Sequence, residues 1–497
     1  MNAGVLYAIQ KEFIGRDTRY QLADGTRAPQ HYLDSTASAL MMKPAFEMAT
    51  EFLRYYANVH STAHFSARNA TRCFRWAQER VLKLLNADQS EYVCIFVGAG
   101  ATAALNRVAQ MRARAFPERN IVLASLMEHH SNDLPHRLHV GRVVHIGLRE
   151  VDGHLATVDL TALERLLHEH GKRVNYVAIT GVSNVTGLIN PLKDICSVAA
   201  DHGVPVIVDG AQMVPHMPLS LSALPSIAAV AFSGHKLYAP GSPGVLVAHR
   251  KFLESVAPVE LGGGMVESVL STDYLVSEVL PDREHAGTPN IWGAVLLGGV
   301  CHILQGIGMQ RIFEEEQRLL VYLNEALSKL EGIRVYGHPD RAQFPRVAAL
   351  AFNVKHIPHA LAAAVLNDYF GIAVRNECFC AHPYVRELLL DELWELEGVE
   401  SGAFANAASV RGIDQWKGML RASIGLYTTP RDIDALVDAL RKILADRDYF
   451  TTRYEATEEG SFRLLGKAEA AVNTFQPDQY IDRALKRLSD VSQCAIA

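Results

Sequence analysis

The sequence predicts an α/β protein built around a mostly parallel, seven-stranded β-sheet. Short β-rich runs alternate with amphipathic helical stretches through the first half of the chain. Several of these runs, such as VPVIVD and IAAVAFS, are continuously apolar, which is typical of strands that are buried on both faces. Polar residues follow the ends of several runs, at the edge where open α/β sheets bind their ligands.

The candidate strands of this sheet follow one another along the first half of the chain. They are residues 92–97, 120–125, 143–147, 176–180, 205–209, 228–233 and 245–248. A crossover helix is expected over NPLKDICSVAADHG, because Asn190 can cap it, Pro191 suits its first turn and Gly203 suits its end. We therefore assign residues 28–297 to a large domain.

The second half of the chain has a different pattern and predicts a smaller α+β domain. Residues 298–332 are expected to be helical, strands are expected near 347–352 and 372–375, and another helix begins near 431. We assign residues 1–27 and 298–497 to this domain. It carries an insertion around 384–418, in which YVRELLLDELWELEG is an amphipathic helix that either covers local core or forms a lid or docking face. It ends in a polar tail, 450–497, with one helical piece, PDQYIDRALKRL.

Composition and charge exclude several classes of function. The chain has 497 residues, a net charge of −6 and no surplus of Lys and Arg, which argues against nucleic acid as a partner. It has no run of apolar residues long enough to span a membrane and no signal peptide, so no membrane association is expected. The count of Cys is 7, an odd number, which indicates a reducing, cytoplasmic location rather than a disulfide framework. No metal site is expected, since Cys378 and Cys380 lack a second ligand pair.

The strongest local signal is FSGHK at 232–236, followed by the glycine-rich PGSPG. A lysine at a strand end, beside groups able to hold a phosphate, suits covalent attachment of a cofactor. Taken alone, Lys236 would more commonly be an exposed surface lysine.

Polar residues on neighbouring strands support the cofactor interpretation. Asp209 ends a buried strand, where a carboxylate can pair with a protonated pyridine nitrogen, and Gln212 lies close behind it. Asn184 and His129 each follow another strand. The glycine-rich stretch at 98–102 follows a strand and opens a helix, and Ala103 stands where a dinucleotide fingerprint requires its third glycine. This favours binding of a single phosphate rather than a pyrophosphate.

The order of these motifs resembles the class V aminotransferase-like enzymes that use pyridoxal 5′-phosphate (PLP), and among them the NifS-like group II cysteine desulfurases. The resemblance covers roughly residues 30–445 and rests on YLD at 32–34, NVH at 58–60, EHH at 128–130, SNV at 183–185, VDGAQ at 208–212, SGHK at 233–236, AGTPN at 286–290 and RAS at 421–423. It implies PLP fold type I, the fold of aspartate aminotransferase.

The resemblance also implies roles for individual residues. Lys236 holds PLP and moves the substrate's Cα proton, and His129 stacks on the ring and assists. Asp209 pairs with the ring nitrogen and Gln212 with the ring oxygen. The remaining cofactor-binding positions are Ala101, Thr102, Ser233 and His235, with Thr288 reaching the phosphate of a neighbouring subunit in a homodimer; the substrate-binding positions are His60, Asn184, Arg375 and Arg421. The family often has a second threonine in place of Ala101 and an arginine in place of Ser61. The resemblance therefore does not establish that the substrate is cysteine.

The desulfurase interpretation depends on Cys380, which occupies the position of the family's nucleophile between Arg375 and Pro383. A thiolate there attacks the substrate's sulfur, leaving a persulfide and releasing alanine. The Cys-Phe-Cys run replaces the Thr-Gly-His-His-Cys of group II and is similar to the loop of molybdenum-cofactor sulfurases. Cys378 either relays or resolves a persulfide or is a packing residue.

The sequence therefore predicts a PLP-dependent enzyme that converts L-cysteine to L-alanine and passes sulfur from Cys380 to an acceptor protein or small molecule. One alternative keeps the fold and changes the reaction to that of a carbon–sulfur or carbon–selenium lyase, or an epimerase, acting on another amino acid. A second alternative is a non-catalytic scaffold, against which Lys236, Asp209 and His129 count.

Overall fold

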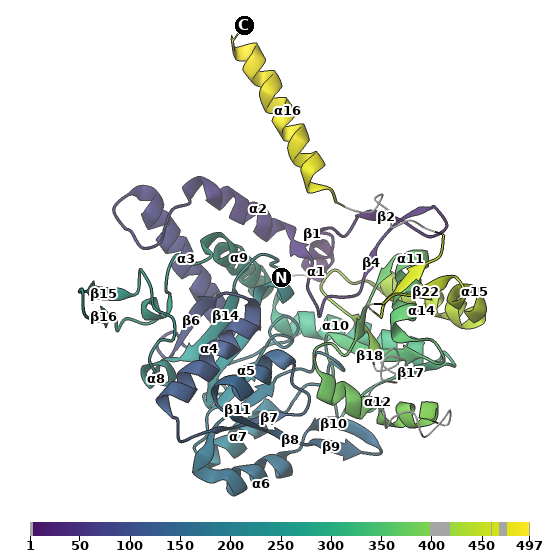
Figure 1. Cartoon of the computed structure of the whole chain (residues 1–497), viewed down its shortest axis with the longest axis horizontal. Coiled ribbons are helices and arrows are strands. Elements are labelled where there is room, and N and C mark those ends of the chain that lie inside the picture. The colour runs from purple at the N-terminus through teal and green to yellow at the C-terminus, as the bar shows by residue number, and fades with distance from the viewer. Residues whose placement is uncertain (1–2, 398–417, 459, 467–474, 497) are drawn as a thin grey trace.

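A seven-stranded sheet forms the centre of the large domain, in the order β6-β14-β13-β12-β11-β7-β8 (Figure 1). The computed structural model describes residues 3–397, 418–458, 460–466 and 475–496. The strands are β6 (Tyr92–Val97), β7 (Ile121–Ser125), β8 (Arg142–Ile146), β11 (Val174–Thr180), β12 (Val206–Asp209), β13 (Ile227–Ser233) and β14 (Gly244–His249). The predicted mostly parallel sheet is confirmed. Only β14 in this sheet runs antiparallel to its neighbours, β13 and β6.

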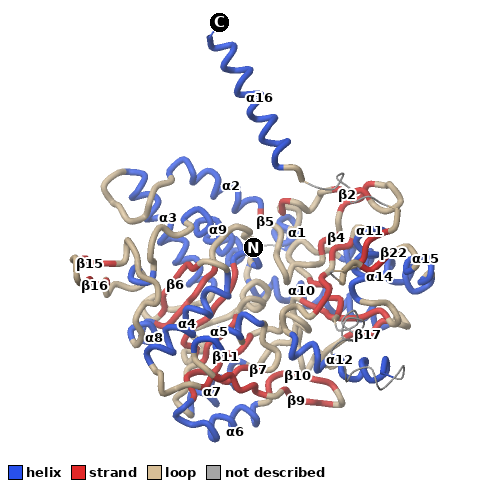
Figure 2. Tube along the Cα trace, viewed as in Figure 1, coloured by secondary structure: helices blue, strands red, loops and turns tan. Residues whose placement is uncertain are grey.

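Both faces of the sheet are buried, which explains the uninterrupted apolar runs in the sequence. Alternate side chains of β6 enter different cores: Cys94 and Phe96 belong to one, and Val93 and Ile95 to the other. The first core is covered by α3 (Phe65–Leu84), α6 (Leu160–His170), α7 (Leu192–Asp201) and α9 (Ile291–Ile307), and the second by α4 (Gly100–Ala115) and α8 (Arg250–Glu254). Figure 2 shows these helices on the two sides of the strands.

The expected crossover helix is α7, but the prediction that Asn190 caps it is wrong. The cap position is Pro191, which offers no side-chain hydrogen bond. The Asn190 side chain instead accepts a hydrogen bond from the Val158 N–H (3.1 Å) and donates one to the Thr180 carbonyl (2.9 Å). Asn190 therefore links β11 to β10 (His154–Val158). Gly203, at φ +65°, stands just beyond the end of α7, as predicted.

The smaller domain contains a four-stranded antiparallel sheet, β17-β18-β21-β20. Its strands are β17 (Ile333–Val335), β18 (Ala349–Val354), β20 (Arg375–Glu377) and β21 (Met419–Ser423), and its helices are α10 (Met309–Ser328), α11 (His359–Phe370) and α14 (Pro430–Ala445). All of these elements except β20 contribute side chains to one apolar core, which also contains Leu33. The segment β4 (His31–Tyr32) pairs with β19 (Ile372–Ala373).

The expected domain limits remain a prediction. Ile9 and Phe13, which the prediction places in the small domain, pack in the core of the large one, and so does most of α9. The change of core falls within α10, where Ile312 joins the large-domain core and Leu319 joins the small-domain core.

Short elements complete the described chain. They are α1 (Ala3–Ile9), β1 (Phe13–Ile14), β2 (Arg19–Gln21), β3 (Arg27–Pro29), β5 (Met41–Met42), α2 (Lys43–Phe52), α5 (Leu134–His139), β9 (Leu148–Val151), β15 (Val266–Val269), β16 (Tyr274–Val276), α12 (His382–Glu397), α15 (Arg447–Thr451), β22 (Tyr454–Ala456), β23 (Phe462–Leu464) and α16 (Pro477–Ile496). The helix expected in the insertion is α12, and residues 398–417 lie outside the described residues. The helical piece expected in the tail is α16, which extends away from the body (Figure 1).

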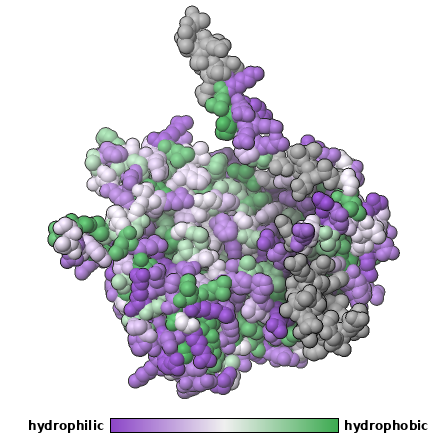
Figure 3. All heavy atoms as spheres, in the orientation of Figure 1, coloured by the Kyte–Doolittle hydropathy of each residue, from purple (hydrophilic) through white to green (hydrophobic). Residues whose placement is uncertain are grey.

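The large domain carries a projecting hairpin with exposed apolar side chains. The hairpin of β15 and β16 stands out from the large domain and exposes Val269, Leu270, Tyr274 and Leu275 (Figure 3). Within the described ranges, no helix is by itself long and apolar enough to cross a membrane. The helices α9 and α10 meet the requirement for length and apolar composition only together, as a pair bent by 79°.

Candidate active site

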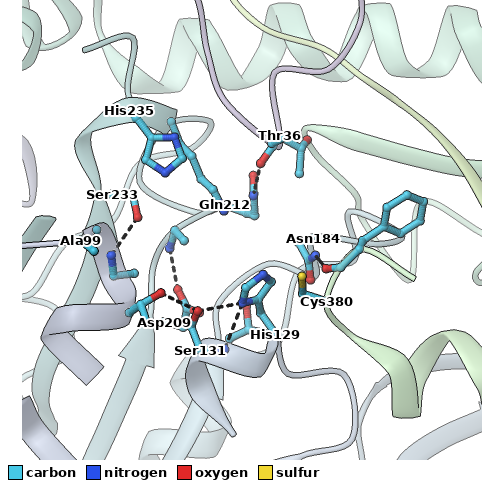
Figure 4. A pocket seen from close by; sticks show the side chains of 18 of the residues that line it. Thr36, Ala99, His129, Ser131, Asn184, Asp209, Gln212, Ser233, His235 and Cys380 are labelled. Carbon is cyan, nitrogen blue, oxygen red and sulfur yellow. Dashed lines mark hydrogen bonds between the residues drawn. The ribbon is translucent and has the colours of Figure 1, made fainter. Parts of the chain in front are cut away.

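A pocket of about 620 Å³ opens where the parallel strands end, and Figure 4 shows its interior. Twelve of the fourteen candidate residues line it: Ala101, Thr102, His129, Asn184, Asp209, Gln212, Ser233, His235, Lys236, Arg375, Cys380 and Arg421. They come from segments that are far apart in sequence. The fold therefore gathers most of the predicted site into one cavity.

Lys236 ends a short 3-10 turn, Gly234–Lys236, that directly follows β13. Burial lowers the pKa of its amine, and the Asp209 carboxylate opposes that shift. A lowered pKa makes the unprotonated, nucleophilic amine more abundant. The turn is tight, since a Cβ atom on Gly234 would lie 1.9 Å from Ser242 Oγ.

Asp209 ends β12 on the strand next to the one that carries Lys236. Burial raises the pKa of its carboxyl group, and the Ala211 N–H, which donates to Oδ1 at 2.9 Å, opposes that shift together with Lys236. Gln212 lies nearby and donates from Nε2 to the Thr36 carbonyl at 2.8 Å. A buried carboxylate in this position suits pairing with a cationic ring nitrogen.

Hydroxyl groups and a helix N-terminus form another part of the pocket wall. The first turn of α4 approaches β13 closely: the Ala101 N–H donates to Ser233 Oγ at 2.8 Å, and a Cβ atom on Gly100 would lie 2.5 Å from that oxygen. Thr102 Oγ1 lies 2.7 Å from Ser131 Oγ. His235 contacts Ser38 Oγ at 3.2 Å through Nδ1. Such an N-terminus with hydroxyl groups around it suits a phosphate.

His129 lies in the pocket with its ring held by Ser131, which the sequence analysis did not single out. The Ser131 N–H donates to Nδ1 at 3.1 Å, and Ser131 Oγ lies 3.0 Å from the same atom. Burial, followed by the Lys236 charge, lowers the pKa of His129 to about 3. The ring is therefore neutral, and because Nδ1 accepts, its proton is on Nε2. The signal for Ser131 was its position directly behind the EHH motif.

Glu128 is a second residue that the sequence analysis left without a role. It is buried and accepts hydrogen bonds from the Thr180 N–H (2.9 Å), Asn132 Nδ2 (2.6 Å) and Ser125 Oγ. Burial raises its pKa to about 8. These bonds tie the segment that carries His129 to the end of β11.

Arg421 and Asn184 lie side by side and contact each other. Arg421 donates to the Asn184 carbonyl at 2.8 Å and to Asp34 Oδ1 at 3.4 Å. Burial lowers the pKa of Arg421 to about 10, and Asp34 opposes that shift. The Asn184 side chain donates from Nδ2 to the carbonyl of Phe379 at 2.7 Å.

Cys380 lines the pocket on the loop between β20 and α12. Glu377, Phe379 and Cys380 have φ values of +93°, +51° and +54°, a conformation that costs about 1–2 kcal/mol for each residue with a side chain. The Cys380 carbonyl accepts from the His130 N–H at 2.7 Å. Cys378 does not line the pocket and packs against an apolar cluster of Met127, Val185, Tyr336, Ala351, Phe379, Ala381, Tyr384, Val385, Leu389 and Met419. This position favours the packing alternative for Cys378.

His60 and Thr288 are the two candidates that do not line the pocket. His60 Nε2 lies 2.9 Å from the Gly287 carbonyl, and Asn58 donates to Thr288 Oγ1 at 3.0 Å. Both residues share an exposed surface of the large domain. Their predicted roles, in substrate binding and in a partner's phosphate site, stay predictions.

The pocket also contains buried polar atoms that no other described residue satisfies. They are Thr36 Oγ1, Gln212 Oε1, Ser242 Oγ and Arg421 Nε. Buried polar groups are normally paired, so orphaned ones around a cavity indicate a polar ligand. An amine, a buried carboxylate and a phosphate cradle in one cavity fit the aldehyde, pyridine nitrogen and phosphate of PLP.

Comparison with known proteins gives the same assignment. Residues 31–436 match the Aminotransferase class-V family. A probable cysteine desulfurase of Halalkalibacterium halodurans is 35% identical over 430 residues, which are 85% of this chain and 94% of the relative. The chain belongs to the class V aminotransferase family, among its cysteine desulfurases. Membership of this family makes the chain a PLP-dependent enzyme.

Further members of the family are similar in sequence and in structure. A cysteine desulfurase of Escherichia coli O127:H6 is 34% identical over 84% of this chain and 93% of its own length. The apo cysteine desulfurase of Thermococcus onnurineus NA1 has a TM-score of 0.71 at 28% identity, over 83% of this chain and 94% of that one. The Escherichia coli cysteine desulfurase CsdA, in an S-sulfonic acid form, has a TM-score of 0.69 at 30% identity, over 88% of this chain and 98% of that one. The predicted fold type I is confirmed.

Proposed function

We propose that this enzyme converts L-cysteine to L-alanine, leaves a persulfide on Cys380 and passes that sulfur to an acceptor. The observation that carries the proposal is that Cys380 lines the same pocket as Lys236, Asp209 and Arg421. A thiol beside a cofactor lysine and a carboxylate-binding arginine is what removal of sulfur from an amino acid requires.

The cofactor-binding residues would hold PLP across the pocket. Lys236 would attach it covalently, Asp209 would pair with its ring nitrogen and Gln212 with its ring oxygen. Its phosphate would lie on the first turn of α4, among Ala101, Thr102, Ser233 and His235. When bound, PLP draws electron density away from the substrate's Cα. Lys236, freed from the cofactor, would then move the Cα proton, and the neutral ring of His129 would stack on the cofactor and assist.

The substrate-binding residues would place the amino acid for sulfur transfer. Arg421 and Asn184 would hold its carboxylate, and Arg375 lines the same pocket. The role of His60 in substrate binding stays a prediction from the resemblance. The Cys380 thiolate would attack the substrate's sulfur, so that the S–S bond forms as the S–Cβ bond breaks. The electron pair of that bond stays on Cβ, which takes a proton and gives alanine.

The partners and location follow from the same assignment. The persulfide would be taken by an acceptor protein or small molecule that brings its own thiol. In the homodimer that the resemblance implies, Thr288, which lies on an exposed surface, would reach the partner's phosphate site. A cytoplasmic location agrees with six cysteines that form no disulfide, which are Cys73, Cys94, Cys196, Cys301, Cys378 and Cys380.

The test compares two neighbouring cysteines in the holoenzyme. With L-cysteine and a thiol reductant, the enzyme is expected to release alanine and sulfide in equal amounts. C380A should lose both products by at least a hundredfold, while C378A, the matched control, should keep them. Full turnover by C380A would reject persulfide chemistry and favour the lyase or epimerase alternative.

A further inference from the structure

Phe379 lies in the pocket between the two groups that the proposed function assigns to the substrate's carboxylate. Its side chain is 6% exposed and lines the cavity. Its carbonyl accepts the 2.7 Å hydrogen bond from Asn184 Nδ2, and its ring centroid lies 4.6 Å from the guanidinium carbon of Arg421. Figure 4 shows Asn184 and Cys380 on the same side of the pocket.

These contacts use the groups that a carboxylate needs. The guanidinium carbon of Arg421 lies over the Phe379 ring, and two of the guanidinium nitrogens donate to Asn184 and Asp34. Its Nε has no partner among the described residues although it is buried. A carboxylate at this position competes with the Phe379 carbonyl for Asn184 Nδ2 and lies next to the Phe379 ring on Arg421.

The backbone of the loop is held in place by these same contacts. Phe379 and Cys380 both have left-handed φ values although neither is glycine, and such conformations persist only where the surroundings enforce them. The described contacts that hold the loop include Asn184 and Arg421 on Phe379, the His130 N–H on the Cys380 carbonyl, and the ring of His382 on that of His130. Loss of the two contacts to Phe379 therefore removes part of what holds the neighbouring Cys380 in its left-handed conformation.

We propose that Phe379 plugs the substrate's carboxylate subsite, so that a bound amino acid and the seated Cys380 loop compete for Asn184 and Arg421. The proposal rests on the proposed function, which places the carboxylate there. It makes loop release depend on a carboxylate: an amino acid displaces Phe379 and frees Cys380 to approach the substrate's sulfur. A primary amine without a carboxylate reaches the cofactor and leaves the plug in place.

The first test measures binding without turnover. L-Alanine and ethylamine are titrated into the holoenzyme, and the PLP absorbance gives each Kd. F379A and F379L should bind L-alanine about threefold to tenfold more tightly than the wild type, because the competing ring contact is gone. Both variants should bind ethylamine with the same affinity as the wild type. L389A is the control, since Leu389 is buried in the same apolar cluster but does not line the pocket; its alanine affinity should not change. Unchanged or weaker alanine binding by both Phe379 variants would overturn the plug.

The second test uses the wild-type holoenzyme alone. Amide hydrogen exchange in residues 377–384 should become faster with saturating L-alanine and stay unchanged with ethylamine. Equal exchange with and without alanine would contradict the proposal. Neither test requires desulfuration. A holoenzyme that binds alanine but forms no persulfide would reject the proposed function, and the alanine and ethylamine results would still decide on Phe379.

Discussion

The imidazole rings of His130 and His382 are stacked, with their centroids 4.8 Å apart and their planes within 6°. His382 Nδ1 and His130 Nε2 are 2.9 Å apart, so one ring donates a hydrogen bond and the other accepts it. His130 adjoins His129 in the pocket wall, and His382 begins α12 directly behind the Cys380 loop. The pair therefore fastens one end of that loop to the active site.

The His130–His382 contact should be sensitive to acid. Burial, followed by the His382 charge, lowers the pKa of His130, while Asp133 opposes the shift. A histidine with a lowered pKa is neutral when the loop is seated, so the contact is lost as the pH falls below the ordinary value of about 6.5. H382A should lower the rate of alanine formation about twofold to tenfold at pH 8, because the Cys380 loop loses the hydrogen bond to His130 that fastens it to the active site. At acid pH the rates of alanine formation by the wild type and by H382A should converge. H382Q, which keeps an acceptor, should retain the wild-type rate, and a ratio of wild type to H382A that is constant with pH would contradict this role.

Glu128 should make the stability of the protein depend on pH. Burial raises its pKa to about 8 in the folded state, above its usual value near 4.5 in the unfolded chain. Stabilisation from such a group is present at low pH and is lost as the pH rises through the folded-state pKa. E128Q cannot titrate, so its free energy of unfolding in urea should vary less between pH 5 and 8 than that of the wild type. At pH 5 the variant should be about 1–3 kcal/mol less stable. A protonated carboxyl group can donate to Ser125 Oγ and still accept from the Thr180 N–H and Asn132 Nδ2, whereas the NH2 group of a glutamine faces one of these two N–H donors in either orientation. An identical pH slope in both proteins would reject this account.

Covalent attachment of PLP should depend on Lys236 alone. Borohydride should fix the chromophore to the wild-type protein at Lys236, and K236A should show no fixation. D209N should still be fixed but should lose PLP more readily and form alanine at least a hundredfold more slowly, because the ring nitrogen loses its anionic partner. Peptide mapping of the fixed chromophore checks both expectations. Fixation of PLP to K236A at another lysine would show that the attachment site is wrong.

Thr288 gives a test of a composite site that uses two defective subunits. If Thr288 reaches the partner's phosphate, T288A and K236A are each impaired as homodimers. In a mixed dimer, one site combines the intact Lys236 of the T288A subunit with the intact Thr288 of its partner. Activity should therefore rise when the two variants are unfolded, mixed and refolded together. Activity equal to the average of the two parents would contradict the composite site.

The strands and the pocket could be predicted because both depend on local sequence. A sheet buried on two faces leaves continuous apolar runs, and the residues that end these runs, such as Asp209 and Ser233, meet at one edge. The single antiparallel strand, β14, leaves no such signal, because an apolar run does not reveal its direction. Asn190 was assigned to the wrong role for a related reason, since its partners, Val158 and Thr180, belong to other strands.

The conformation of the Cys380 loop could not be predicted from the sequence. Its left-handed residues are Glu377, Phe379 and Cys380, and none of them is a residue type that favours this conformation. Contacts with His130 and Asn184, which are distant in the chain, enforce it instead. The same holds for Ser131 and Glu128, whose roles depend on the orientation of side chains in the folded protein.

The central claim is that sulfur is transferred from L-cysteine to Cys380 in this pocket. The most direct measurement is a single turnover: the holoenzyme is mixed with an equal amount of L-cysteine without reductant, and alanine and the mass of each cysteine peptide are determined. We expect one alanine for each extra sulfur atom, with that sulfur on the Cys380 peptide. Alanine formed without any added sulfur on Cys380, or sulfur found on Cys378 in its place, would contradict the account.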